Sequence, residues 1–288
     1  MPYLIFTVVF VLMLSVGMSL RPAELMVHWR RHDGLSWLGL FFATFLAPTF
    51  FALLLARLFH LKHGEAAGLF LLGVAPGAPL LVRNVSQKGF DLHIAAGYQL
   101  WSALLIPVMI PIIVYSAGKL YGREIWIAPA ILLHQVLWKQ LLPVALGMVL
   151  AYFAPNIAGR CQRPLALIGN VLLAVTLVLI LIKIGAALKA ITLLVPLGTL
   201  LLAGGSLLAM LAIHLSNPVL KPTLALCNVN RHVGLALLLG GQYVGAKNAI
   251  PTVVCYALIA PLVMFAYARF VRRHERWQRT AATGSSGD

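Results

Sequence analysis

Long, nearly uncharged apolar stretches constrain the fold of this chain more than any other feature of its sequence. A helix that crosses a bilayer needs about 20 mostly apolar residues, and most of the chain consists of stretches of that kind. The loops between them are too short to hold a folded domain, so we predict one transmembrane domain over residues 1–271. The nine expected spans are 3–20, 36–59, 66–88, 92–117, 125–153, 164–187, 191–214, 219–243 and 248–271.

The composition is typical of an integral membrane protein rather than of a soluble one. Hydrophobic residues make up 61% of it and charged residues only 10%, whereas soluble domains carry roughly 45–50% apolar and about 25% charged residues. This balance excludes a soluble enzyme, a disordered protein and a disulfide scaffold. The net charge of +15 lies mostly in short loops, where it acts as a topology signal, so we expect no nucleic-acid partner. The predicted fold class is an all-α polytopic membrane protein whose partner is the lipid bilayer.

The placement of Lys and Arg predicts how the chain is oriented. The first segment begins Met1-Pro2-Tyr3 without the basic start of a signal peptide, so we expect it to be retained as a helix. If the N-terminus lies outside, the cytoplasmic loops hold clearly more Lys and Arg than the outer loops do. We therefore predict a multi-pass protein of the plasma (inner) membrane with its N-terminus outside and its C-terminus in the cytoplasm. Residues 272–288 are expected to form a basic, disordered tail that faces anionic lipid.

Two of the nine segments contain residues that interrupt a helix. In the third segment Pro76, Gly77 and Pro79 stand near mid-membrane, where proline removes backbone hydrogen bonds. Interrupted backbone is tolerated in a bilayer only where it is buried in protein or lines a wet cavity. We therefore predict two discontinuous helices. The eighth segment places four strongly polar residues within five positions: Asn228, Asn230, Arg231 and His232.

The two interrupted segments are five segments apart, so they cross the membrane in opposite senses. The segments that follow them, 92–117 and 248–271, also correspond, because each carries two prolines. This pattern is typical of an inverted-topology repeat, with the binding site where the two discontinuous helices cross. The alternative is that the correspondence is chance, because Gly and Pro are common in membrane helices in any case.

Several motifs, taken in order along the chain, resemble the bile acid:sodium symporter family. The stretch from Gly68 to Gly77, a glycine-rich run that leads into a Pro-Gly break, resembles the fourth helix of that family, and Gly234-Leu235-Ala236 resembles the ninth. Residues 17–22 resemble the end of its second helix and residues 141–147 its sixth. The resemblance implies nine of the usual ten helices, in a panel domain and a core domain that carries the crossed helices. It also implies secondary transport of an organic anion, often driven by sodium.

Arg231 points most directly to an anionic substrate. A charge at mid-membrane costs roughly 2.5–3.5 kcal/mol on insertion scales, and the acidic residues all fall in loops, at segment ends or in the tail. The guanidinium must then be met by backbone carbonyls, by water or by a bound anion, and a purely structural role is the alternative. Lys139 has two interpretations. Either it faces the central cavity and attracts anions, or its side chain snorkels to a membrane interface. The candidate substrate-binding residues are Arg231, His232, Asn228, Asn230, Pro76, Gly77, Asn84, Gln99 and Lys139.

This chain matches the fold motifs of the family better than it matches the residues that bind sodium there. Where the ninth helix of the family has a glutamate and, four residues later, a glutamine, this chain has Cys227 and Arg231. The family's Ser-Asn pair after the Pro-Gly break falls on Leu81 and Val82, unless a local shift brings Asn84 into place. Sodium is kept as an open alternative, and we expect no other cofactor. The residues that could still hold a sodium ion are Asn84, Ser102, Asn228 and Asn230.

The leading interpretation is a symporter-like secondary active transporter of a small organic anion, working by alternating access, and not an enzyme. An auxin-efflux-like carrier or a passive anion channel is the first alternative. An integral-membrane transferase is the second, and it is disfavoured because such chemistry usually needs an acid–base pair or a metal-binding carboxylate. The sequence leaves the substrate, the coupling ion and the oligomeric state open.

Overall fold

Helix is the regular secondary structure of every described part of the chain. The computed structural model describes residues 2–19, 34–78, 81–121, 134, 137–189, 192–240 and 246–284. Helices suit these apolar stretches because a helix satisfies its own backbone groups where water is absent. The elements are α1 (Pro2–Ser19), α3 (Gly34–Phe41), η1 (Phe42–Leu46), α4 (Ala47–Leu58), α5 (His63–Val74), α6 (Leu81–Gln87), α7 (Leu92–Tyr121), η3 (Leu137–Leu141), α9 (Leu142–Phe153), α10 (Pro155–Lys189), α11 (Leu194–Ala212), η4 (Pro218–Leu220), α12 (Lys221–Val229), α13 (Val233–Leu239) and α14 (Ala246–Gly284).

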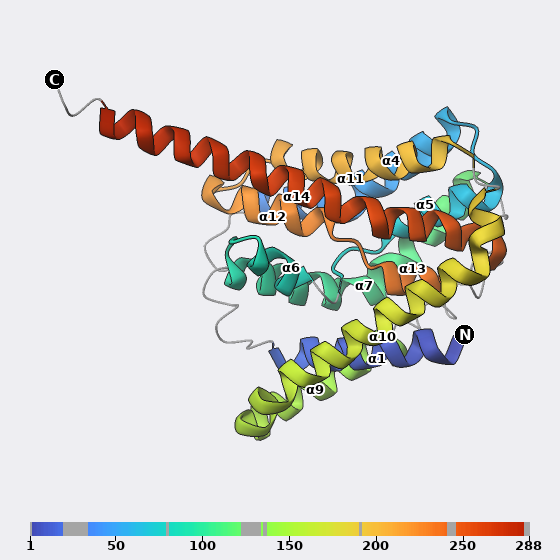
Figure 1. The fold of residues 1–288 in the computed structure, drawn as a ribbon, viewed down its shortest axis with the longest axis horizontal. Coiled ribbons are helices and arrows are strands. Elements are labelled where there is room, and N and C mark those ends of the chain that lie inside the picture. The colour runs from blue at the N-terminus through green and yellow to red at the C-terminus, as the bar shows by residue number, and fades with distance from the viewer. Residues whose placement is uncertain are drawn as a thin grey trace.

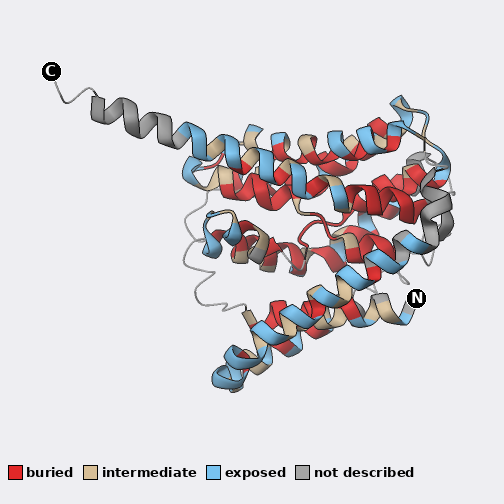
Figure 2. Ribbon diagram, in the orientation of Figure 1, coloured by how far each residue is buried: buried red, intermediate tan, exposed pale blue. Residues whose placement is uncertain are grey.

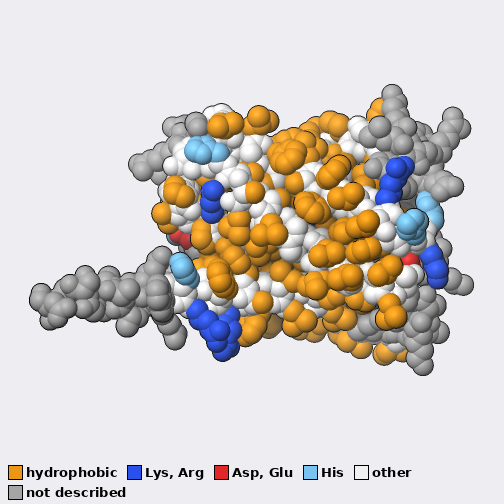
Figure 3. Space-filling view, turned by 90° about the horizontal axis from the view of Figure 1, so that it is seen from above, with side chains coloured by type: hydrophobic (Ala, Val, Ile, Leu, Met, Phe, Trp, Pro, Cys, Tyr) orange, Lys and Arg blue, Asp and Glu red, His pale blue; other side chains and the backbone are white. Residues whose placement is uncertain are grey.

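Four described stretches of helix are long and apolar enough to cross a membrane, and each coincides with an expected span to within a few residues. Figure 3 shows one face of the molecule, on which hydrophobic side chains fill the middle and Lys, Arg and His gather toward the two ends. The chain is therefore an integral, multi-pass membrane protein. The total of nine spans and the inverted repeat stay predictions. The four stretches are Gly34–Leu58, Leu92–Ala117, Leu194–Ala212 and Ala249–His274.

Two helices extend beyond the expected bounds. α10 begins at Pro155 rather than near residue 164, because proline is favoured in the first turn of a helix, where its missing N–H would have no partner. α14 continues to Gly284, through the stretch that we expected to be disordered from residue 272. This stretch contains several Arg and Ala residues, one Glu and one Gln, all of them good helix formers. Part of the expected span 125–153 lies outside the described residues.

The helices form two groups that meet along one side. α1 packs against α9 and α10, and these three lie together along the lower edge of Figure 1. In the second group, α11 packs against α4, α12 and α14, and α5 packs against α4 and α14. Figure 2 shows continuous burial in this group around α5, α12 and α13. The groups meet where α1 contacts α13 and where α10 contacts α14.

Glycine allows α1 and α9 to approach closely. A Cβ atom on Gly147 would meet the carbonyl oxygen of Leu14 and would lie 2.8 Å from the backbone nitrogen of Met18. Gly17 faces it, because a Cβ atom there would lie 3.0 Å from the Cα of Gly147. Close backbone contact through small residues is a common basis of helix association in membranes. This contact holds the first helix group together.

Gly147→Ala is expected to lower the free energy of unfolding by about 1–3 kcal/mol, because the added methyl group overpacks the contact between α1 and α9. Gly159→Ala is the matched control, since a Cβ atom at that position of α10 would meet nothing within 4 Å. Alanine is also the better helix former, so the control should be at least as stable as the wild type. Thermal unfolding in detergent measures both variants. Equal stability of the two would contradict the close approach of the helices.

Candidate functional site

The first interruption lies between α5 and α6. The chain leaves α5 at Val74 and enters α6 at Leu81. Pro76 has no N–H to donate, and Gly77 has a φ of +71°, in the left-handed region that favours glycine. The side chain of Gln99 on α7 donates from Nε2 to the Gly77 carbonyl at 3.1 Å. The structure therefore brings three residues of the predicted site, Pro76, Gly77 and Gln99, together at this interruption.

The second interruption joins α12 to α13 through residues 230–232, which are not helical. His232 caps α13, because its Nδ1 accepts a hydrogen bond from the backbone N–H of Leu235 at 3.0 Å. Since Nδ1 is the acceptor, the neutral ring carries its proton on Nε2. The hydroxyl of Tyr256 on α14 donates to the carbonyl of Val229 at 2.6 Å. The same carbonyl also accepts from the backbone N–H of Arg231 at 3.0 Å, so Tyr256 ties this turn to α14.

The two interruptions lie side by side and share backbone hydrogen bonds. The N–H of Ala78 donates to the carbonyl of Asn230 at 3.1 Å, and the N–H of His232 donates to the carbonyl of Ala75 at 2.9 Å. Ala75 and His232 are both fully buried. Each interruption thus uses backbone groups that the other leaves unpaired, which a medium without water requires.

Arg231 is 1% exposed and is held by hydrogen bonds to several elements. Its Nη1 donates to the carbonyls of Thr44 at 2.9 Å and Gly73 at 3.4 Å. Its Nη2 donates to the Ser206 hydroxyl at 3.3 Å and to the Asn228 Oδ1 at 3.1 Å. All four acceptors are neutral, so these bonds occupy donors of the guanidinium without cancelling its charge.

The acidic side chains that the structure describes are engaged elsewhere. Glu65 accepts hydrogen bonds from the backbone and the hydroxyl of Thr192. Asp91 accepts hydrogen bonds from two backbone amides in the first turn of α7. Among the described side chains, therefore, no carboxylate neutralises Arg231.

Asn228 uses its side-chain amide to fix the second interruption to three other elements. Its Nδ2 donates to the carbonyl of Ala43 in η1 at 2.9 Å and to that of Ser206 in α11 at 2.6 Å. Its Oδ1 accepts from the hydroxyl of Tyr98 on α7 at 3.0 Å and from Arg231 at 3.1 Å. Both donors and both acceptor positions of the amide are therefore used within the protein.

Sequence reasoning missed the two tyrosines that support this arrangement. Tyr98 and Tyr256 have 0% exposure, and their hydroxyl groups bond to Asn228 and to the carbonyl of Val229. A tyrosine well inside an apolar span is a usable signal, because a buried hydroxyl needs a hydrogen-bond partner. The identity of that partner depends on contacts between distant helices, which the sequence does not reveal.

A cavity of about 170 Å³ lies where the two helix groups meet. One wall is apolar and comes from α1 and α10. The other wall comes from both interruptions and from α6, α13 and α14. Four predicted site residues line this second wall: Asn84, Asn230, Arg231 and His232.

Three of these lining residues carry a buried N–H donor without a hydrogen-bond partner. The atoms are Nδ2 of Asn230, Nε of Arg231 and Nε2 of His232. Leaving such a donor unpaired costs roughly 1–3 kcal/mol. No acidic residue is among the described residues of the cavity wall. The cavity therefore suits a ligand group with acceptor oxygens, and most of all an anionic one, because charge-assisted hydrogen bonds are the stronger ones.

N–H donors cannot coordinate a metal cation. A hard cation such as sodium takes oxygen ligands instead. Of the predicted sodium ligands, Asn84 and Asn230 line the cavity. Ser102 instead donates to a backbone carbonyl of α7 at 3.0 Å, and the Oδ1 of Asn228 accepts two hydrogen bonds. The guanidinium of Arg231 repels any further cation beside it. The described residues at the cavity therefore do not fit a sodium ion.

The remaining predicted site residues with described side chains do not line the cavity. Lys139 belongs to η3, and its side chain lies outside the described residues. The roles assigned to this set from the sequence stay predictions. Those that lie against the interruptions without lining the cavity are Pro76, Gly77, Gln99, Ser102 and Asn228.

Comparison with known proteins yields one family. A family model described as the Sodium Bile acid symporter family matches residues 6–191. The matched range contains the first interruption and all of α10, and it ends before α12 and α13. No curated protein matches the chain.

Proposed function

The chain belongs to the Sodium Bile acid symporter family, whose model matches well over half of it, and we propose from this that it is a secondary active transporter of an organic anion. Membership confirms the resemblance noted in the sequence, and it places the chain among membrane transporters. The observation that carries the choice of an anion is the set of three unpartnered N–H donors at one cavity.

The cavity offers complementary surfaces to the two ends of such a substrate. A carboxylate or sulfonate group would accept from the donors of Asn230, Arg231 and His232, and the charge of Arg231 would attract it from water. The apolar wall from α1 and α10 suits a hydrocarbon body. Ligand sites commonly combine a mostly apolar lining with a few placed polar groups.

We propose that the two helix groups move relative to each other during transport. The group of α1, α9 and α10 would act as the panel, and the group that contains both interruptions would act as the core. The cavity lies along the seam between them. A small displacement there would open it toward one side of the membrane or the other. Figure 1 places the start of α1 and the end of α14 at opposite ends of the molecule, which favours the proposed outside N-terminus and cytoplasmic C-terminus.

The fixed charge of Arg231 is proposed to take the place of a bound cation. It lies against both interruptions, with one hydrogen bond to Gly73 at the end of α5 and another to Asn228 in α12. A permanent internal cation leaves no need for sodium to neutralise the substrate. We therefore expect transport that depends only weakly on a sodium gradient.

Uptake into proteoliposomes tests the proposal, with a panel of radiolabelled carboxylates and sulfonates and with or without sodium and a proton gradient. We expect saturable accumulation of at least one acid and a change of less than about twofold when sodium is replaced by potassium. Linear flux without saturation or counterflow would indicate a channel instead. Strict dependence on sodium would contradict the proposed role of Arg231.

A bulky side chain in the cavity sharpens the same experiment. Ala257 lines the cavity on α14, whereas its neighbour Leu258 is 55% exposed on the outer surface. Ala257→Trp should abolish saturable uptake, because the indole occupies a large share of about 170 Å³. Leu258→Trp adds an aromatic ring one residue away and should transport normally. Unimpaired uptake by Ala257→Trp would show that the substrate binds elsewhere.

A further inference from the structure

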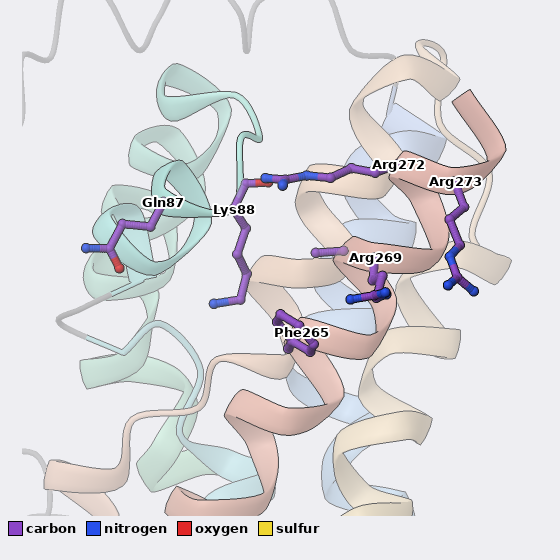
Figure 4. Close-up of a pocket in the computed structure, with 7 residues that line it drawn as sticks. Gln87, Lys88, Phe265, Arg269, Arg272 and Arg273 are labelled. Carbon is purple, nitrogen blue, oxygen red and sulfur yellow. The ribbon is translucent and has the colours of Figure 1, made fainter. Parts of the chain in front are cut away.

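A second hollow of about 560 Å³ lies between the loop after α6 and the basic end of α14. Its described lining holds three arginines, one lysine and no acidic residue. Figure 4 shows Lys88 on one side of the gap and Arg269 on the other, both near Phe265, while Arg272 reaches across above them. Arg269, Arg272 and Arg273 are three and four positions apart, so the helix presents them at one end of one face.

Two contacts hold the walls of this hollow in place. Arg272 donates from Nη2 to the backbone carbonyl of Lys88, which ties the loop to α14. The rings of Phe90 and Tyr267 stack with their centroids 6.4 Å apart and their planes at 16°. The side chains of Lys88 and Arg269 therefore face each other across a gap whose width is set by contacts that involve neither of these two side chains.

The hollow lies at the level where apolar helices give way to charged residues. Lys88 comes shortly before the stretch Leu92–Ala117, and Arg269 and Arg272 fall in the last turns of the stretch Ala249–His274. An apolar stripe runs along the outside of α14 into the hollow, with Leu258 55%, Leu262 67% and Phe265 58% exposed. A ligand that fits both features has an anionic head beside the basic residues and hydrocarbon chains along the stripe.

We propose that this hollow binds the phosphate group of an anionic phospholipid. The guanidinium of Arg269 matches phosphate oxygens in a two-pronged geometry, and the ammonium of Lys88 adds a point charge from the facing wall. Basic residues at the membrane surface attract anionic lipid, and basic pockets between membrane helices bind their head groups. The acyl chains would lie against Leu262 and Phe265. A free phosphate ion would gain nothing from that stripe, which is why the site is assigned to a lipid.

Native mass spectrometry of the full chain in detergent tests this assignment by titration with phosphatidylglycerol and with phosphatidylcholine of the same acyl chains. We expect phosphatidylglycerol to bind at least about tenfold more tightly, from the contribution of two cations near the surface. Lys88→Gln combined with Arg269→Gln should reduce that preference to within about twofold. Arg160→Gln combined with Arg163→Gln is the matched control, since it removes two exposed cations from α10 and should keep the preference.

Three outcomes would overturn the proposal. One is equal loss of the preference in the control variant, which would mean that only the overall charge matters. Another is full competition by millimolar inorganic phosphate, which would assign the hollow to the free ion. The third is a retained preference in the Lys88/Arg269 variant. Thermal unfolding in phosphatidylcholine checks that this variant folds. If the double variant does not fold, the two single variants provide the same test, and each is expected to lose part of the preference.

Discussion

Replacing Arg231 by glutamine is expected to raise the apparent KM for the transported anion at least about tenfold. The substitution removes the charge and the unpartnered Nε donor of a residue that lines the cavity, and a hydrogen bond to a charged group contributes about 1.5–3 kcal/mol. It also removes donors from the carbonyls of Thr44 and Gly73, so thermal stability should fall as well. Uptake kinetics and thermal unfolding in detergent measure the two effects separately.

Tyr98→Phe is the control that separates an effect on substrate binding from an effect on the stability of the site. It deletes the hydrogen bond to Asn228, and Tyr98 itself is not among the residues that line the cavity. Stability should fall by about 1 kcal/mol, with the KM unchanged to within about twofold. Arg231→Lys keeps the charge but loses the planar fork, so its KM should lie between wild type and Arg231→Gln. A folded Arg231→Gln protein with a wild-type KM would leave Arg231 as a purely structural residue.

Gly77→Ala is expected to lower the free energy of unfolding by about 2–5 kcal/mol and to abolish uptake. Two physical effects add at this position. A residue with a Cβ atom pays roughly 1–2 kcal/mol for the left-handed conformation, here at a φ of +71°. The new methyl group would also collide with the hydroxyl of Ser102, and overpacking costs typically 1–3 kcal/mol.

The double variant Gly77→Ala/Ser102→Ala isolates the two effects. Removing the hydroxyl of Ser102 relieves the collision but leaves the backbone strain and loses the bond to Gln99, so the double variant should lose clearly less stability than the sum of the two single variants. Ser102→Ala alone should cost about 1 kcal/mol, for the bond to the Gln99 carbonyl. Chemical denaturation in mixed micelles measures all three proteins. Additive costs, without recovery in the double variant, would contradict contact between the two side chains.

The sequence predicts where the backbone is interrupted better than it predicts what the interruptions contact. Pro76 and Gly77 follow the end of α5, and the polar residues from Asn228 onward coincide with the end of α12. The first is a local effect, because proline and a left-handed glycine end a helix whatever surrounds them. The second contains neither, and its signal is the cluster of polar residues in an apolar segment. The predicted disorder from residue 272 is wrong as far as Gly284, because α14 continues through a stretch whose residues mostly favour helix.

The sequence predicts the type of partner that Arg231 needs, but not which residues supply it. The sequence shows that a mid-membrane arginine without acidic residues near it needs neutral acceptors or an anion. It does not show that Thr44, more than 180 residues earlier, supplies one of them. The cavity depends in the same way on how α1 and α10 meet α14, which is a property of packed surfaces rather than of any segment. Sodium ligands were proposed from the family resemblance and from residue type. Neither reveals that Ser102 does not line the cavity or that the Oδ1 of Asn228 already accepts two hydrogen bonds.

The backbone bonds shared by the two interruptions also constrain the order of events during synthesis. Ala75 and Ala78 emerge from the ribosome long before His232 and Asn230, which are their partners in the folded chain. At about 5–20 residues per second the delay is roughly 10–30 s. Until then these amide and carbonyl groups lack the partners that a bilayer interior demands. The third segment is therefore expected to complete its burial only after residues 230–232 have been synthesised.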